Sequence, residues 1–339
     1  MDPLDQPVDP LRAPQDRHHL TDPAQCATAL PLAKAIVARL ERHARHAQGA
    51  LAPETERALR KTSAAFTGWT TAQGLVALPA TAETVATYVD ALAAQERKPA
   101  SVRQAVWAIA TLHRAAGLPD LSKAEPVRLA LKRMARSLGT RQRQAAPLGD
   151  HEVARILATA GTDLAAIRDV ALVLTMRDLL ARRSEVVALD LEDLSRADGG
   201  AGTALIRRSK TDQAGLGEVR WLSPETCLHL RRWIKAAGIE DGPVFRPVNK
   251  AGMVGTAALQ GGEVSRILKR LAARAGLDPA TISGHSARVG MAQDLVAGGA
   301  DLAAVMQAGR WKSPTMPARY AERLLAKRGA VAGYYDKRG

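Results

Sequence analysis

Five residues of this chain have the side chains that transfer of a phosphodiester to a tyrosine requires. His285 and Arg288 stand in SGHSARVG, Tyr320 follows them, and Arg182 and Lys210 precede them in ARRSEVVAL and RRSKTD. Arginine stays charged and offers a planar fork, so two guanidinium groups can neutralise charge on non-bridging phosphate oxygens. A phenol attacks phosphorus only with a nearby base or strong phosphate activation, and the leaving 5′-oxygen needs a proton donor. Together the five residues meet these needs.

Each residue alone also has an ordinary structural interpretation. Arg182 could form a surface ion pair with Glu185, one helical turn away. His285 could be a buried histidine with satisfied hydrogen bonds, and Trp311 and Tyr320 could belong to a core. The order and spacing of the residues, rather than any one of them, favours a catalytic site.

Length and composition indicate a helical protein of two domains with a polyanionic partner. A chain of 339 residues suits two cores. Hydrophobic residues make up 46% but aromatic residues only 3%, which favours helices rich in Ala and Leu. The formal charge of +14 favours DNA, RNA or an anionic membrane, and charge alone does not separate these.

Several classes of cofactor and location are disfavoured by the sequence. Cys26 and Cys227 lie in unrelated contexts, with no disulfide or zinc spacing. The sequence has no P-loop and no clustered carboxylates of the two-metal kind. The start, MDPLDQPVDP, is unlike a signal peptide, and no apolar run approaches a membrane span. We expect no cofactor, no metal and a cytoplasmic location.

Prolines, glycines and runs of polar residues predict where helices end and where the chain divides into domains. A β-hairpin is expected where TALIRR and GEVRWL flank SKTDQAGLG. The other periodic segments read as helices, among them one from Ala100 to Ala116 that Gly117 ends. The expected parts are a mobile tail (1–30), a helical DNA-binding domain (31–138), a linker (139–149), a catalytic domain (150–323) and a C-terminal helix or tail (324–339).

The motifs in their order resemble the tyrosine recombinase (phage integrase) family. SGHSARVG, VMQAG, the spacing from Trp311 to Tyr320, LSRADGG, SKT and LHRAAGLP carry the resemblance, which covers roughly residues 53–325. It implies a mainly α fold of two domains that form a C-shaped clamp on DNA. The first would be a helical core-binding domain, and the second a mostly helical catalytic domain with a small antiparallel β-sheet or hairpin.

The resemblance also implies a role for each matching residue. Arg182 and Arg288 would bind non-bridging phosphate oxygens, and Lys210 would protonate the leaving 5′-oxygen. His285 would hydrogen-bond the phosphate and take the proton of Tyr320. Tyr320 would attack, giving a 3′-phosphotyrosine and a free 5′-hydroxyl.

Two further residues would support this chemistry, and three depart from the family pattern. Glu185 would support the site without reacting, and the indole N–H of Trp311 would donate to phosphate. Arg183 adds a second candidate beside Arg182, and Arg310 replaces a small residue. Pro317 predicts a late start for the helix of Tyr320.

Basic and polar side chains on exposed helix faces are candidate DNA contacts, with a solvated surface as the alternative. Gln suits adenine and Arg suits guanine in the major groove, whereas other contacts would reach phosphate only. The candidates are Arg57, Arg60, Lys61, Arg103, Gln104, Arg141, Arg143, Arg266, Lys269 and Arg270.

The resemblance implies a homotetramer on two double-stranded DNA duplexes, each with an inverted-repeat target. Leu324, Leu325, Val331 and Tyr334 would form an apolar helix face that docks on a neighbouring protomer. Strand exchange through a Holliday junction would take place at the nucleoid of a prokaryote or a phage-infected host. The alternatives are an inactive sequence-specific DNA-binding protein, a phage integrase or type IB topoisomerase-like strand transferase and, more remotely, a membrane-surface protein.

Overall fold

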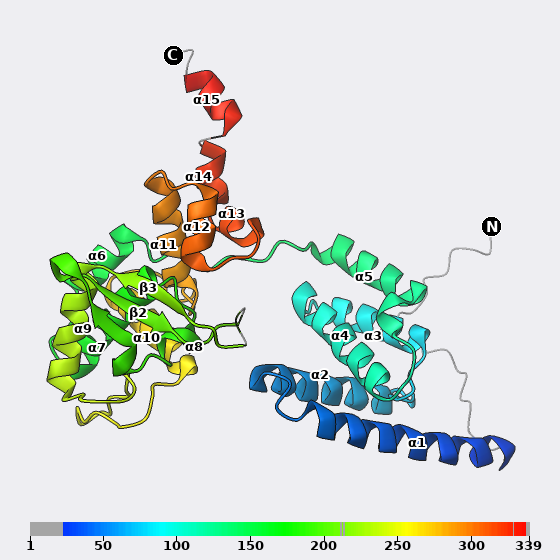
Figure 1. Cartoon of the computed structure of the whole chain (residues 1–339). Coiled ribbons are helices and arrows are strands. Elements are labelled where there is room, and N and C mark those ends of the chain that lie inside the picture. The colour runs from blue at the N-terminus through cyan, green and yellow to red at the C-terminus, as the bar shows by residue number, and fades with distance from the viewer. Residues whose placement is uncertain (1–22, 211, 213, 328, 337–339) are drawn as a thin grey trace. The chain divides into compact units, whose positions relative to one another are not determined.

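The chain divides into two compact units, residues 1–142 and 143–339. The computed structural model describes residues 23–210, 212, 214–327 and 329–336 (Figure 1). Within the described ranges, no helix is both long enough and apolar enough to cross a lipid bilayer.

Every regular element described in the first unit is a helix or a helical turn. Proline stands in the first turn of four of them, where a missing N–H costs no intrahelical bond. The side chain of Thr81 caps another by accepting a hydrogen bond from the backbone N–H of Thr84. The elements are α1 (Pro23–Ala47), α2 (Pro53–Ala72), α3 (Ala82–Ala94), α4 (Pro99–Ala115), a 3₁₀ turn (Leu121–Lys123) and α5 (Glu125–Leu138).

The start of α1 corrects the expected tail, of which residues 1–22 lie outside the described residues. We expected the first helix to begin at Pro31, but α1 begins at Pro23 and contains Pro31. The segment AQCATAL is rich in helix-forming residues, which offsets the hydrogen bond that Pro31 cannot donate.

The core of the first unit lies between α2, α3, α4 and α5. Val85, Val102 and Ile109 are buried there. Phe66, Trp69 and Tyr88 add an aromatic cluster, for example with 4.9 Å between the ring centroids of Trp69 and Tyr88. The opposite faces of these helices carry the charged side chains.

The second unit combines helices with one small sheet. Its elements are α6 (Asp150–Ala158), α7 (Leu164–Asp178), α8 (Arg183–Val186), two 3₁₀ turns (Leu191–Asp193 and Asp198–Gly200), β1 (Leu194–Arg196), β2 (Gly202–Ile206), β3 (Glu218–Leu222), α9 (Pro224–Ala237), α10 (Gly261–Arg274), α11 (Ser286–Ala297), α12 (Leu302–Gly309), α13 (Thr315–Tyr320), α14 (Glu322–Lys327) and α15 (Ala330–Asp336).

The sheet contains the expected hairpin and one further strand. Its order is β1-β2-β3, all antiparallel, with Thr203 of β2 opposite Ser195 of β1 and Trp221 of β3. The three-residue β1 is too short to show a periodic pattern in the sequence. The fold is therefore mainly helical with a small antiparallel sheet, as predicted.

Helix α7 forms the centre of the second unit. It is buried on all sides, with Leu172, Val173 and Met176 fully buried, and it packs against α9 and α11. Helices α11, α12, α13 and α14 lie side by side (Figure 1) and share a smaller core that includes Leu180 and Val296. Unlike the expected C-terminal helix or tail, residues after Tyr320 form two helices, α14 and α15.

Candidate active site

Arg182 and Glu185 form the first part of the site, at the start of α8. The carboxylate of Glu185 is buried and accepts two hydrogen bonds from Arg182, at 2.9 Å from its backbone N–H and 2.5 Å from Nη1. Burial would raise the pKa of Glu185, but the charge of Arg310 and the hydrogen bonds from Arg182 outweigh burial and lower it. The ion pair considered from the sequence is thus present, but it lies inside the site.

Arg288 is held rigidly in the first turn of α11. Its side chain is buried, and its two terminal nitrogens donate to the backbone carbonyls of Leu180 and Gly309. The guanidinium carbon lies 4.2 Å from the ring centroid of Trp311, a cation–π contact. Burial and the nearby charge of Arg182 lower the pKa of Arg288, which shows that positive charge is crowded here.

His285 occupies the N-cap position of α11 without a capping hydrogen bond from its side chain, and the residue is exposed. Partial loss of water lowers the pKa of His285, and the charges of Arg183, Arg288, Arg182 and Lys210 lower it further. The imidazole is therefore neutral near pH 7 and can accept a proton.

Trp311 and Tyr320 approach each other through the turn between α12 and α13. Their ring centroids lie 5.9 Å apart in an edge-to-face arrangement. A Cβ on Gly309 would lie 1.8 Å from the Trp311 ring, so the indole position requires glycine there. The backbone carbonyl of Tyr320 accepts a hydrogen bond of 2.9 Å from the side-chain amide of Gln293 on α11.

Pro317 does not delay the helix that carries Tyr320. Helix α13 begins at Thr315, so Pro317 is its third residue. Backbone N–H groups in the first turn have no intrahelical partner, so proline is tolerated at that position. The expected late start is wrong.

Lys210 lies in the loop between β2 and β3, which Asp212 organises. The Asp212 carboxylate accepts backbone hydrogen bonds from Gly215, Leu216 and Gly217. These bonds, that of Gly217 first, lower the pKa of Asp212. Lys210 contributes to the lowered pKa of His285, after burial and the charges of Arg183, Arg288 and Arg182.

The two unexpected arginines have different positions. Arg183 is exposed and donates from Nη1 to the hydroxyl of Ser265 at 3.2 Å, so Arg182 is the residue that faces Glu185. Arg310 donates from Nη2 to the second oxygen of Glu185 at 2.6 Å, and both side chains are almost fully buried. The sequence showed Arg310 only as a departure from a small residue and gave no indication of this contact.

Three of the candidate DNA contacts in the first unit lie together. Arg57 and Lys61 of α2 and Gln104 of α4 line one cavity of about 360 Å³, which Arg97 also lines. Arg57 forms an exposed ion pair with Glu54, at 2.5 Å. Arg60 and Arg103 are exposed on the same two helices and do not line this cavity.

The other candidate contacts lie in or beside the second unit. Arg266 and Lys269 are exposed on α10. Arg270 also has a structural partner, because its Nη2 donates to the buried carboxylate of Asp169 at 2.5 Å. Arg141 and Arg143 are exposed between α5 and α6.

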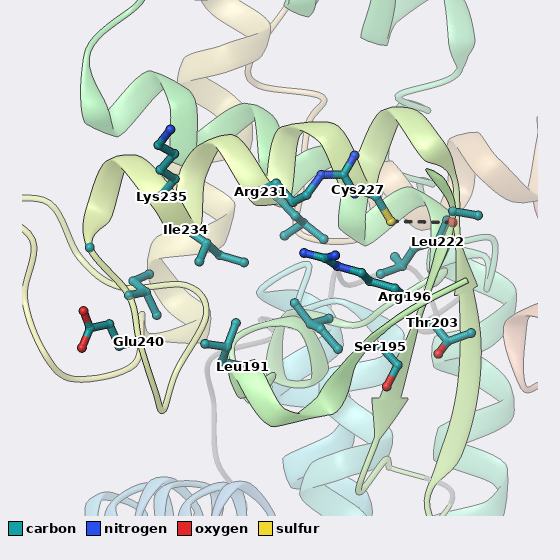
Figure 2. Close-up of a pocket in the computed structure, with 15 residues that line it drawn as sticks. Leu191, Ser195, Arg196, Thr203, Leu222, Cys227, Arg231, Ile234, Lys235 and Glu240 are labelled. Atoms are coloured by element: carbon teal, nitrogen blue, oxygen red, sulfur yellow. Dashed lines mark hydrogen bonds between the residues drawn. The ribbon is translucent and has the colours of Figure 1, made fainter. Parts of the chain in front are cut away.

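A cavity of about 550 Å³ lies apart from these residues, between the sheet and α9 (Figure 2). Arg196, Cys227 and Arg231 line it, and none of the seven predicted catalytic residues does. Burial raises the pKa of the Cys227 thiol, which makes it a poor nucleophile. In the part of the chain described, no group of His, Cys, Asp and Glu could hold a metal ion.

The chain is similar to known proteins over most of its length. The profile of the Phage integrase family matches residues 147–326. An "Integrase/recombinase xerD homolog" of Selenomonas ruminantium is 32% identical over 80% of this chain and 82% of its own length. "Recombinase cre" of Escherichia phage P1 is 30% identical over 75% of this chain and 79% of its own length.

Solved structures of low sequence identity share the fold. The Tn1549 transposon integrase in complex with transposon right end DNA has a TM-score of 0.60 at 14% identity, covering 86% of this chain and 98% of that one. A lambda integrase dimer bound to a COC′ core site has a TM-score of 0.57 at 16% identity, covering 90% of this chain and 82% of that one.

Proposed function

The chain belongs to the phage integrase family, and we propose that it is a site-specific DNA recombinase that uses Tyr320 as its nucleophile. As a member of this family it is a tyrosine recombinase, an enzyme that breaks and rejoins DNA strands. The proposal for this site rests on one observation. Tyr320 is surrounded by Arg288 and Trp311, and the ion pair of Arg182 and Glu185 lies beside these residues.

In the first step, the phenol oxygen of Tyr320 attacks phosphorus and the bond from phosphorus to the 5′-oxygen breaks. Neutral His285 accepts the phenol proton, and Lys210 donates a proton to the leaving 5′-oxygen. Arg182 and Arg288 stabilise the charge on the non-bridging oxygens, with the indole N–H of Trp311 as a further donor. The product is a 3′-phosphotyrosine.

The second step reverses the first with a different strand. A 5′-hydroxyl of the partner duplex attacks the phosphotyrosine and displaces Tyr320, which recovers its proton. Each step exchanges one phosphoester bond for another, so the proposed reaction consumes no ATP. Guanidinium groups stabilise the negative charge of the transition state, so the proposed mechanism uses no metal.

The assembly we infer is a homotetramer on two duplexes that exchange strands through a Holliday junction. The two units would clamp an inverted-repeat site, and the formal charge of +14 supports binding of a polyanion. Exposed Val331 and Tyr335 on α15 support a contact between protomers. The place of action would be the nucleoid.

Replacement of Tyr320 by phenylalanine tests the proposal. The target is first recovered by selecting random duplex DNA for binding to the full chain, and a nicked duplex of that site is then offered as substrate. The unchanged protein should form a covalent adduct that survives denaturation. The nick allows the short fragment with the new 5′-hydroxyl to dissociate, so the reverse reaction is prevented. Tyr320→Phe should bind the duplex with similar affinity and form no adduct.

Tyr335→Phe is the matched control, since it removes an exposed hydroxyl and should leave adduct formation intact. Adduct from Tyr320→Phe would contradict the assignment of the nucleophile. Binding without any adduct from the unchanged protein would instead support an inactive sequence-specific DNA-binding protein.

A further inference from the structure

Arg310 has a backbone conformation that arginine rarely adopts. It directly follows α12 with φ 57° and ψ 44°, in the left-handed region. Glycine is the usual residue where a helix ends this way, because a Cβ is disfavoured there. Such strain persists where the surrounding structure fixes it, often at functional sites.

The side chain of Arg310 is buried with part of its hydrogen-bonding capacity unused. Only 5% of it is exposed, and its Nη2 donates to Glu185. Its Nε and Nη1 are buried and have no hydrogen-bond partner among the described residues. A buried charged donor without a partner is costly, so these two groups need an acceptor that the described residues do not supply.

Glu185 does not satisfy the charge of this cluster. Its carboxylate already accepts from the backbone and the guanidinium of Arg182. Arg182, Arg288 and Arg310 therefore share one carboxylate, and burial, followed by the charges of Arg182 and Arg310, lowers the pKa of Arg288. An anion bound among the three guanidinium groups would relieve this excess of positive charge.

We propose that Arg310 is a further catalytic residue, whose unpaired N–H groups donate to a non-bridging oxygen of the scissile phosphodiester. This inference rests on the proposed function. Arg310 would hold Glu185 through Nη2 and contact the phosphate through Nε or Nη1. The positive charge at the phosphate would then come from three arginines, two of which the sequence pattern identifies.

Arg310→Gly is the sharpest variant, because glycine suits the left-handed backbone and should preserve the fold. Single-turnover adduct formation on the nicked duplex should fall about 100-fold, the usual effect of losing one donor to a developing oxyanion. DNA affinity, measured separately, should change little. The melting temperature should fall, because Glu185 loses one of its two buried arginine partners, so both proteins are assayed well below the melting temperature of the variant. Arg310→Lys keeps a charge without the planar fork, so its rate of adduct formation should lie between the rates of the unchanged protein and of Arg310→Gly.

Lys312→Gly is the matched control for the loss of one positive charge in the same turn. Lys312 is exposed, so the rate of adduct formation by this variant should stay within about 3-fold of that of the unchanged protein. If Arg310→Gly formed adduct as fast as Lys312→Gly, the inference would be overturned.

A duplex with a methylphosphonate at the scissile position separates contact with phosphate from support of Glu185. Methyl replaces a charged oxygen, so a residue that binds that oxygen loses its advantage. The rate ratio between the unchanged protein and Arg310→Gly should shrink from about 100 to within about 3. A ratio that stayed near 100 would show that Arg310 acts only through Glu185, which contradicts the inference.

The outcomes also separate the inference from the proposed function. If the unchanged protein formed no adduct on a phosphodiester, both would fall. If it formed adduct through Tyr320 and only the Arg310 results went against expectation, the proposed function would stand alone.

Discussion

Glu185 is the residue on which the arrangement of the site depends most. It accepts hydrogen bonds from Arg182 and Arg310 while buried, and it lowers the repulsion that each guanidinium exerts on Arg288. A buried ion pair is costly to break because the remaining charge has no water around it. In the proposed mechanism Glu185 holds the arginines in place and takes no part in bond making.

If His285 is the base, its pKa determines how adduct formation depends on pH. Its lowered pKa lies below the ordinary 6.5, so the neutral base is present at neutral pH. At subsaturating DNA, where the rate reports the free enzyme, the rate should fall on acidification with a midpoint below pH 6.5. A pH–rate profile measures this.

The sign of the effect follows from the direction of the shift. A depressed pKa means that protonation, and with it loss of the base, occurs at lower pH than for an unperturbed histidine. An acidic limb with its midpoint above 6.5, or one unchanged in His285→Gln, would contradict this role.

Individual residues differed in how far the sequence could place them. The spacing of His285, Arg288 and Tyr320 placed them in one candidate site because the motif is specific. Arg310 could not be predicted, because its contact with Glu185 depends on a left-handed backbone and on burial, which no spacing shows. Arg182 was ambiguous beside Arg183 until its hydrogen bonds to Glu185 were known.

At the scale of elements, the C-terminal end of α12 brings much of the site together. The carbonyl of Gly309 accepts from Arg288, and those of Gln307 and Ala308 accept from Arg220 of β3. Positive charge at the C-terminus of a helix is favourable, because the last carbonyls have no intrahelical partner. The sheet and α11 are thereby tied to the turn that presents Trp311.

Gly309→Ala tests the importance of that turn. The added Cβ would lie 1.8 Å from the Trp311 ring, so the indole must leave its place over Arg288. We expect a loss of about 1–3 kcal/mol in the free energy of unfolding, from overpacking, together with slower adduct formation. Urea unfolding and the adduct assay measure the two effects.

Gly262→Ala is the control, in the first turn of α10. Among the described residues, no neighbouring group lies within 4 Å of the added carbon. This variant should keep its activity and gain up to about 1 kcal/mol in stability. Identical behaviour of the two variants would show that the close approach of Gly309 and Trp311 is unimportant.

The sequence predicted long periodic elements better than short ones. The alternation in TALIRR and GEVRWL identified the hairpin of β2 and β3, whereas the three residues of β1 show no pattern. The start of α1 was misplaced because Pro31 reads as a beginning, although the residues before it favour helix. Two helices after Tyr320 were expected as one segment.

At the scale of the whole molecule, a basic chain of two units carries its predicted DNA contacts on both. Arg57, Lys61 and Gln104 lie on the first unit and Arg266 and Lys269 on the second. Most such contacts reach phosphate and position the protein, while base contacts specify the sequence. The sequence predicted a polyanionic partner from charge, but the target bases depend on geometry and DNA deformability as well.

Removal of α15 tests the proposed assembly. Deleting residues 328–339 takes away exposed Val331 and Tyr335 but keeps α14, whose Leu324 packs on the core beneath the site. Adduct formation on one duplex should persist, and exchange between two duplexes should be lost. Gel analysis of both reactions measures this, and full exchange by the shortened chain would contradict a contact through α15.

The central claim is that Tyr320 becomes covalently joined to DNA. The measurement that tests it most directly is mass spectrometry of the peptide that remains attached to DNA after the nicked duplex has reacted. The account predicts a 3′-phosphate linked to Tyr320, one of four tyrosines in the chain. Attachment to Tyr88, Tyr334, Tyr335 or any residue other than Tyr320 would contradict it.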